Sequence, residues 1–170
     1  ALMFEKIIGD ALIEKVSDVH IEVRPSGGVI RMRKNGEMVP YQYNDKPILT
    51  FTEANDLCSV IYNVLASTKA VSFDPRDCQQ AAVNYTINEQ ELKLRYQSVP
   101  AYPDGYDVIL RLLPIGRSED FTPLQKLGYT EQQVKDLINI SSRPVGSLII
   151  AGVTGSGKST TMKNLLMYIN

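Results

Sequence analysis

A glycine-rich loop is the clearest chemical signal in the sequence. The stretch AGVTGSGKST at 151–160 satisfies the spacing G-x-x-x-x-G-K-[ST]. Glycines let successive backbone N–H groups point at phosphate oxygens, and a helix that follows adds the positive end of its dipole. In this motif the lysine reaches the β- and γ-phosphates and the serine hydroxyl binds Mg²⁺. The loop therefore predicts a site for ATP and Mg²⁺, with Lys158 as the catalytic residue and Ser159 as the metal ligand. The predicted nucleotide-binding residues are Thr154, Gly155, Ser156, Gly157, Lys158, Ser159 and Thr160.

The segments on either side of the loop have the pattern that such a loop requires. The run SLIIA at 147–151 is continuously apolar, which is typical of a strand buried on both faces of a sheet. After the loop, Met162, Leu165, Leu166 and Ile169 recur at helical spacing. We therefore expect the order strand, loop, helix.

Hydrolysis needs groups that the sequence after the loop does not provide. An acidic residue must hold Mg²⁺ and another group must orient the attacking water, and both normally lie on later strands. Only eleven residues follow Ser159, which is enough for one helix. A parallel partner strand would need a crossover of a dozen residues or more. We therefore expect this chain to be a portion of a larger ATPase and to be inactive by itself.

The segment before the loop predicts an α+β domain with an antiparallel sheet over 1–113. Helical spacing and period-two alternation identify its elements. The expected helices are 1–16 and 52–68, and the expected strands are 19–24, 29–34, 37–43, 81–87, 91–97 and 106–113. Residues 114–123, bracketed by two prolines, predict an interdomain linker, and 124–170 predict the incomplete start of a second domain.

The second domain is expected to open with a capped helix. Thr130 and Gln133 have the spacing of a capping box, and Tyr129 and Val134 have the spacing of its hydrophobic staple. The helix should end near Ser141, before the proline at 144.

Composition narrows the class of protein. Net charge is -1 and no run of Lys or Arg occurs, which argues against bulk attraction to nucleic acid or anionic membranes. Cys58 and Cys78 are too few for a disulfide scaffold, which favours a reducing compartment. The sequence has no apolar run of membrane-spanning length.

Several segments together resemble the secretion ATPase superfamily, the motors of type II secretion, type IV pili and related conjugation or type IVB secretion systems. The similar segments are SDVHIEV at 17–23, RMRKNGEM at 31–38, RYQSVP at 95–100, ILRLL at 109–113, LGY at 127–129 and LIIAGVTGSGKSTTM at 148–162. They occur in the family's order and cover nearly the whole chain. Asn35 replaces the Asp that is usual before Gly36, and 74–82 lacks the family's PQDG segment, so the chain is identified as a divergent member.

The resemblance implies a PAS-like N-terminal domain joined by a flexible linker to a RecA-like α/β P-loop ATPase domain. It implies ATP bound between these domains, whose turnover rotates one against the other around a hexameric ring. The implied partners are identical subunits and an inner-membrane platform protein, with no direct contact to nucleic acid. The implied location is cytoplasmic, at the inner face of that membrane. The family's acidic boxes, Walker B strand and histidine box would lie beyond Asn170.

Two arginines outside the loop are further candidates. Arg111 lies in an apolar strand, where a cation needs a partner. It could bind nucleotide phosphates as a bidentate donor, or form an ion pair with a carboxylate. Arg95 shares its strand face with Glu91 and Lys93, so it could belong to a solvated face. The resemblance implies that both arginines contact phosphate.

Other polar residues suggest weaker alternatives. His20 and Glu22 share a strand face, but the P-C-x-x-C partner of a zinc deaminase is absent, so we expect an exposed or interface face. Arg31 and Arg33 are expected on a solvated face or toward a neighbouring subunit. We interpret six scattered tyrosines as core or interface residues: Tyr41, Tyr43, Tyr85, Tyr96, Tyr102 and Tyr106.

Two rival functions stay open at this point. One is a non-enzymatic, nucleotide-responsive scaffolding module that binds ATP weakly because half of the pocket is missing. The other is a nucleic-acid-translocating conjugation ATPase, against which the balanced charge argues.

Overall fold

The protein divides into two compact units. A computed structural model describes residues 2–69, 71–87, 89–114, 122–153 and 156–169. The first unit contains Ala1–Ile115 and the second contains Gly116–Asn170. Most of the expected linker, 115–121, lies outside the described residues.

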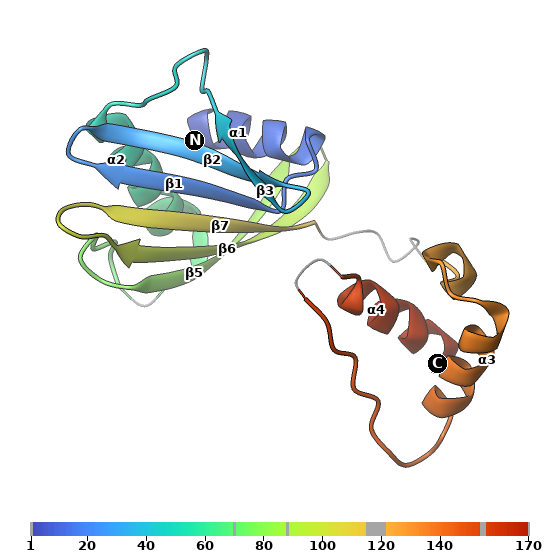
Figure 1. The fold of residues 1–170 in the computed structure, drawn as a ribbon. Helices are drawn as coiled ribbons and strands as arrows, with labels where there is room; N and C mark the ends of the chain where they lie inside the picture. Colours follow the sequence, from blue (N-terminus) through green and yellow to red (C-terminus); the bar gives the residue numbers. More distant parts are fainter. Residues whose placement is uncertain (1, 70, 88, 115–121, 154–155, 170) are drawn as a thin grey trace. The chain divides into compact units, whose positions relative to one another are not determined.

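The first unit is an α+β fold built on one seven-stranded antiparallel sheet (Figure 1). Its strands are β1 (Asp18–Arg24), β2 (Gly27–Lys34), β3 (Glu37–Tyr41), β4 (Ala66–Thr68), β5 (Gln79–Ile87), β6 (Gln90–Pro100) and β7 (Tyr106–Pro114). Their spatial order is β3-β2-β1-β7-β6-β5-β4. The first and last strands of the unit are therefore neighbours at the middle of the sheet, and residues far apart in sequence meet there.

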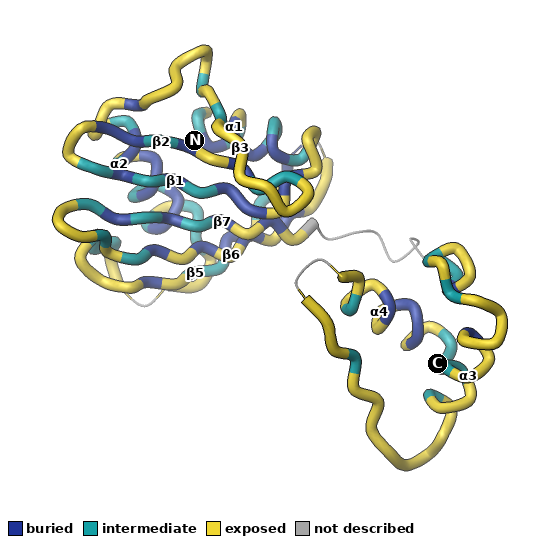
Figure 2. The backbone as a smooth tube through the Cα atoms, in the orientation of Figure 1, coloured by how far each residue is buried: buried dark blue, intermediate teal, exposed yellow. Residues whose placement is uncertain are grey.

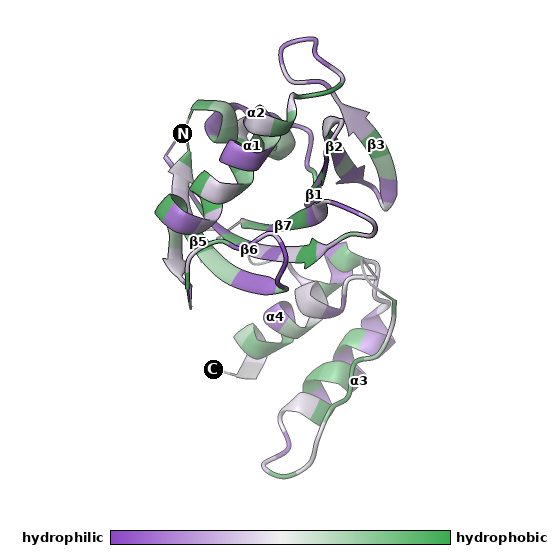
Figure 3. Ribbon diagram, turned by 90° about the vertical axis from the view of Figure 1, so that its left-hand side faces the viewer, coloured by the Kyte–Doolittle hydropathy of each residue, from purple (hydrophilic) through white to green (hydrophobic). Residues whose placement is uncertain are grey.

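Two helices, α1 (Leu2–Ile13) and α2 (Phe51–Val60), cover one face of this sheet (Figures 1 and 3). Alternate strand residues point toward the helices and are buried, whereas their neighbours are partly or fully exposed (Figure 2). The period-two pattern of the sequence predicted this arrangement, because one face of each strand had to be apolar. The largest fully buried side chains of the unit are Tyr62, Tyr96, Tyr106, Phe4, Ile7, Ile8, Ile21, Ile61, Leu92, Leu94 and Leu110.

The second helix of this unit ends earlier than its sequence pattern predicted. After α2 the chain forms one π-helical turn, η1 (Ile61–Leu65), and then enters β4 at the edge of the sheet. The expectation of helix to residue 68 is wrong at its end because the edge of β5 offers other partners: Ala66 pairs with Val83, and Ser67 Oγ donates to the carbonyl oxygen of Ala82. Helical periodicity alone cannot detect such a competing sheet edge.

A close contact between sheet and helix at Gly28 gives a stability prediction. A Cβ atom added to Gly28 on β2 would lie 2.3 Å from the Cβ of Ala54 on α2. Gly28→Ala should therefore lower the free energy of unfolding by about 1–3 kcal/mol through overpacking, measured by urea denaturation of the chain. Gly9→Ala on α1 is the matched control, because nothing lies within 4 Å of its added Cβ. This control should raise stability by up to about 1 kcal/mol. Equal stability of Gly28→Ala and the parent would show that β2 and α2 are not packed this closely.

The second unit consists, in its described residues, of one 3₁₀ turn and two helices, η2 (Leu124–Leu127), α3 (Glu131–Ser141) and α4 (Lys158–Ile169). The capping box at the start of α3 is confirmed: the Thr130 side chain accepts from the Gln133 backbone N–H, and the Thr130 backbone N–H donates to the Gln133 side chain. A small core of Leu124, Val134 and Leu165 joins the three elements.

The expected strand at 147–151 is wrong. These residues form no strand, and Leu148 and Ile149 are 43% and 86% exposed. Figure 2 shows the whole segment before the glycine-rich loop as mostly exposed. A strand needs a hydrogen-bonded neighbour, and the described residues of this unit contain no other strand. An apolar run indicates that a segment tends to be buried, but it does not indicate whether a neighbouring strand is present to pair with it.

The expected apolar stripe on α4 is only partly buried. Leu165 is 3% exposed, but Met162 and Leu166 are about half exposed, and the side chain of Ile169 lies outside the described part of the structure. Thr161 and Asn164 are buried instead.

None of the helices in the described residues is both long and apolar enough to cross a membrane.

Candidate nucleotide-binding site

The glycine-rich loop leads directly into α4, as the motif requires. Gly157 has φ +85°, a left-handed conformation that favours glycine. A Cβ atom on Gly152 would lie 2.6 Å from Ser156 Oγ, so a side chain at 152 would require the Ser156 side chain to move. The helix begins at Lys158, and its free N–H groups therefore follow the loop. Thr154 and Gly155, two of the expected nucleotide-binding residues, lie outside the described residues.

The ammonium group of Lys158 lies close to the backbone of the glycine-rich loop. Lys158 Nζ donates to the carbonyl oxygen of Val153 at 2.7 Å. The ammonium group therefore lies against the backbone of the loop. The other residues expected to bind nucleotide, Ser156, Gly157, Ser159 and Thr160, are exposed and accessible to a ligand.

A pocket of about 320 Å³ adjoins this loop within the second unit. Leu127, Tyr129 and Gln133 line it together with Gly157 and Thr160. The Tyr129 hydroxyl and Thr161 Oγ1 are 2.9 Å apart and share a hydrogen bond. Sequence reasoning assigned Tyr129 and Gln133 only to helix capping and missed that they border the loop, because no local pattern joins 127–133 to 156–161.

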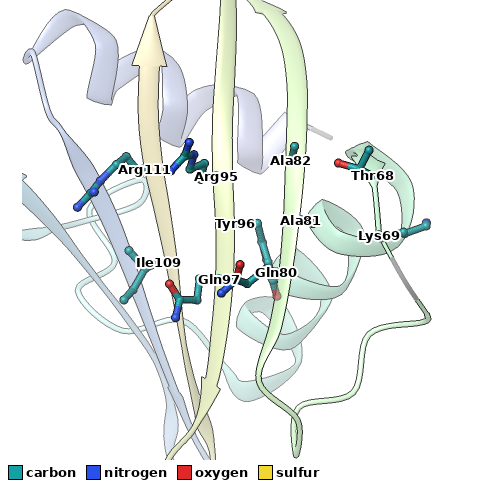
Figure 4. Close-up of a pocket in the computed structure, with 10 residues that line it drawn as sticks. All are labelled: Thr68, Lys69, Gln80, Ala81, Ala82, Arg95, Tyr96, Gln97, Ile109 and Arg111. Carbon is teal, nitrogen blue, oxygen red and sulfur yellow. The ribbon is translucent and has the colours of Figure 1, made fainter. Parts of the chain in front are cut away.

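In the first unit, the face of the sheet that the helices leave open carries a row of charged residues. The strand register places Asp18 between Arg33 on β2 and Arg111 on β7. Arg111 is in turn directly opposite Arg95 on β6. Figure 4 shows Arg95 and Arg111 side by side on neighbouring strands. The row therefore contains three arginines and one carboxylate.

Arg111 makes the ion pair that was one of its two sequence alternatives. Its Nε donates to Asp18 Oδ1 at 2.8 Å. The Asp18 side chain is 5% exposed, whereas that of Arg111 is 53% exposed. The carboxylate is thus fixed in the sheet and the guanidinium is accessible. This ion pair occupies the Nε edge of the Arg111 guanidinium.

Asp18 is held in its charged form. Burial raises the pKa of its carboxyl, but hydrogen bonds from Arg111 and Ser17, together with the positive charges of Arg111 and Arg33, outweigh burial and leave the pKa below its ordinary value. Asp18 is therefore ionised at neutral pH and balances the charge of one arginine.

A shallow pocket of about 810 Å³ lies at this end of the open face. Arg95 and Arg111 line it with a third cation, Lys69, and the polar side chains of Gln80 and Gln97 (Figure 4). No acidic residue is among its lining residues in the described chain. Such a surface favours anions, and guanidinium groups favour phosphate or carboxylate. Sequence reasoning missed Lys69, which follows the edge strand β4 that it also missed.

The remaining polar candidates are placed beside this row. Arg31 Nε lies 3.4 Å from Glu22 Oε1, and Arg33 Nε lies 3.5 Å from Asp18 Oδ2. Both arginines therefore have acidic partners. His20 is partly buried; burial, and next the charge of Arg33, lower its pKa. In the described chain, no three His, Cys, Asp or Glu residues gather in a way that could hold a metal ion.

The six tyrosines differ in burial, and three of them, Tyr41, Tyr43 and Tyr85, are partly buried against the core. Tyr96 and Tyr106 are buried in the core, as one of their two interpretations predicted, and the Tyr62 and Tyr96 rings pack at a tilt of 54° with their centroids 5.3 Å apart. Tyr102 is 97% exposed and so is not a core residue.

Comparison with known proteins places the whole chain in one family. The family described as Type II/IV secretion system protein matches residues 1–170. Similar curated proteins include the type IV pilus assembly ATPase PilB of Thermus thermophilus, 28% identical over 165 residues, which are 97% of this chain and 17% of that protein. Type II secretion system protein E of Xanthomonas campestris is 30% identical over 164 residues, 96% of this chain and 27% of that protein. Competence protein ComGA of Halalkalibacterium halodurans is 28% identical over 163 residues, 95% of this chain and 43% of that protein. The chain therefore spans less than half the length of each of these relatives.

Proposed function

Because the chain belongs to the type II/IV secretion system protein family, we propose that it is the ATP-binding portion of a hexameric motor ATPase. In this proposal the complete protein converts ATP hydrolysis into domain rotation, which drives pilus assembly or the transport of secreted proteins. The observation that carries the proposal is the glycine-rich loop that leads into α4, with Lys158 beside its backbone. A similar protein that is named as an ATPase of pilus assembly supports it.

The two units would have different roles. We assign 1–113 to a PAS-like N-terminal domain, 114–123 to the linker and 124–170 to the beginning of a RecA-like P-loop domain. The separate cores of the two units support a division of this kind. In the complete protein, the Walker B and acidic residues would come from outside this chain.

The loop would bind the nucleotide through charge and backbone N–H groups. Lys158 would leave the Val153 carbonyl oxygen for the β- and γ-phosphates, and the Ser159 hydroxyl would bind Mg²⁺. Mg²⁺ neutralises the charge that develops during phosphoryl transfer. Backbone N–H groups of the loop and of the first turn of α4 would donate hydrogen bonds to the phosphate oxygens. Thr154, Gly155, Ser156, Gly157 and Thr160 belong to this proposed set.

Arg95 and Arg111 would add positive charge on the phosphate side in the assembled protein. Both arginines are exposed, and no acidic side chain lines their pocket in the described residues. Transition states of phosphoryl transfer are stabilised by such guanidinium groups.

The proposed partners follow from the family. They are identical subunits in a ring and an inner-membrane platform protein, and the proposed location is the cytoplasmic face of that membrane. The formal net charge of -1 supports the absence of a direct nucleic-acid partner.

Hydrolysis measurements test the proposal against its two rivals. The complete protein should hydrolyse ATP only when Mg²⁺ is present, and chelation by EDTA should abolish turnover because the phosphates lose their counter-charge. The 170-residue chain alone should show no turnover above background. Added DNA should leave the rate unchanged.

Three other results of these measurements would contradict the proposal. Hydrolysis by the 170-residue chain would show that its catalytic groups are complete. Strong stimulation by DNA would favour a nucleic-acid translocating motor. Absence of ATP binding by the complete protein would favour a scaffolding module.

A further inference from the structure

We propose that Asp18 is a positioning residue for phosphate recognition, which holds the Arg111 guanidinium by its Nε edge and leaves both terminal nitrogens for the ligand. This inference rests on the proposed function, because it assumes that Arg111 contacts nucleotide phosphate. It goes further by assigning the orientation of that arginine to one buried carboxylate on another strand.

The geometry of the ion pair carries the proposal. Asp18 Oδ1 accepts from Arg111 Nε at 2.8 Å, and this is the single hydrogen bond that the Arg111 side chain makes within the described residues. A guanidinium that is bound only through Nε still presents Nη1 and Nη2, two donors that can take up phosphate oxygens. An arginine with a bidentate contact to the carboxylate through its terminal nitrogens would have lost that capacity.

The carboxylate itself is fixed from several sides. Ser17 Oγ donates to Asp18 Oδ2 at 2.8 Å, and Arg33 Nε lies 3.5 Å from the same oxygen. Asp18 is directly opposite Arg33 and Arg111 in the registers of β1 with β2 and of β1 with β7. A carboxylate anchored in this way can restrict a long side chain whose own exposed fraction is 53%.

Stability alone does not account for this arrangement. Arg95 and Arg111 are directly opposite each other on β6 and β7, and like charges in this position destabilise a sheet. Arg95 makes no ion pair within the described residues, and Lys69 lines the same pocket. The row therefore keeps an excess of positive charge, and Asp18 compensates only one side of it. An anionic ligand would complete the neutralisation.

The charge of Asp18 should affect ATP binding and ATP turnover differently. Its negative charge repels phosphate, so its removal should not weaken ATP binding. The loss of orientation should lower the rate of hydrolysis, because Arg111 would no longer be held in its working position. Asp18→Asn keeps the size of the side chain and removes the charge, so it separates these two effects.

The experiment measures kcat and KM for ATP with the complete protein as wild type, Asp18→Asn, Arg111→Ala and the double variant. Asp18→Asn should lower kcat about tenfold, which corresponds to about 1.4 kcal/mol, without raising KM. In the Arg111→Ala background the same change should lower kcat less than about twofold, since Asp18 acts through Arg111. Glu22→Gln is the matched control. Glu22 lies on the same strand and the same face as Asp18, and it pairs with Arg31 on the neighbouring strand β2. The kcat of this variant should stay at the wild-type value.

The outcomes separate this inference from the proposed function. If Arg111→Ala lowers kcat and Asp18→Asn does not, the positioning role is wrong and the motor proposal stands. Independent, multiplicative effects of the two changes would make Asp18 a structural residue and would also overturn the inference. A normal kcat of Arg111→Ala would remove the phosphate role of Arg111, and the inference would fail with it.

A second measurement needs no change at Asp18 and covers the case in which Asp18→Asn does not fold. In ¹⁵N spectra of the wild-type chain, the Nε–H signals of Arg111 and Arg95 can be assigned from Arg111→Lys and Arg95→Lys variants. The Arg111 Nε–H should exchange with water more slowly than that of Arg95, because only the former donates to a carboxylate. Equal exchange rates would overturn the inference.

Discussion

Replacement of Lys158 by alanine is expected to abolish ATP turnover by the complete protein. The ammonium group of Lys158 lies 2.7 Å from a carbonyl oxygen of the loop that we propose to bind phosphate, and no other Lys or Arg occurs between 144 and 162. Loss of one preorganised donor in an active site typically lowers kcat by about 10²–10³-fold. We expect a loss of at least this size, measured as phosphate release at saturating ATP and Mg²⁺.

Lys163→Ala is the matched control for this change. Lys163 lies on the same helix and is exposed, so the substitution removes an equal charge away from the loop. Its turnover should equal that of the parent. Normal hydrolysis by Lys158→Ala would contradict the assignment of the loop, whereas equal losses in both variants would indicate a general effect on α4.

The sequence was sufficient to predict most elements of the first unit because each of these has its own local signal. The run DVHIEVR of β1 alternates over its whole length, and the apolar positions of α1 recur at helical spacing. These periodicities result from one buried face per element, and every strand of this sheet has such a face except the short edges. The three-residue β4 is too short for alternation to identify it, and it was therefore included in the preceding helix.

Contacts between distant residues could not be predicted in the same way. Arg111 and Asp18 are 93 positions apart, and they meet because β1 and β7 are neighbours in the sheet. The sequence showed that a cation in an apolar strand needs a partner, but only the register identifies the partner. Lys69 joins the pocket for the same reason, since the sheet order brings the end of β4 to the side of β5 and β6.

Replacement of Arg111 by alanine is expected to reduce hydrolysis strongly while the fold is kept. A hydrogen bond to a charged group is worth about 1.5–3 kcal/mol, so its loss from a transition state should lower kcat about tenfold to a hundredfold. The side chain is half exposed, and Asp18 keeps Ser17 and Arg33 as partners. We therefore expect the free energy of unfolding to fall by only about 1 kcal/mol. Phosphate release and urea denaturation, measured on the same samples, separate the two effects.

Arg31→Ala is the matched control for Arg111→Ala. Arg31 occupies the same open face and pairs with Glu22 at 3.4 Å, so its removal also breaks one partly exposed ion pair, but it does not line the pocket of Arg95 and Arg111. Its kcat should match that of the parent. A loss of stability in Arg111→Ala without a loss of kcat in the folded fraction would make the Asp18–Arg111 pair purely structural. A tenfold loss of kcat at nearly unchanged stability would instead place Arg111 in the chemistry, since only Arg111→Ala removes a guanidinium from this pocket.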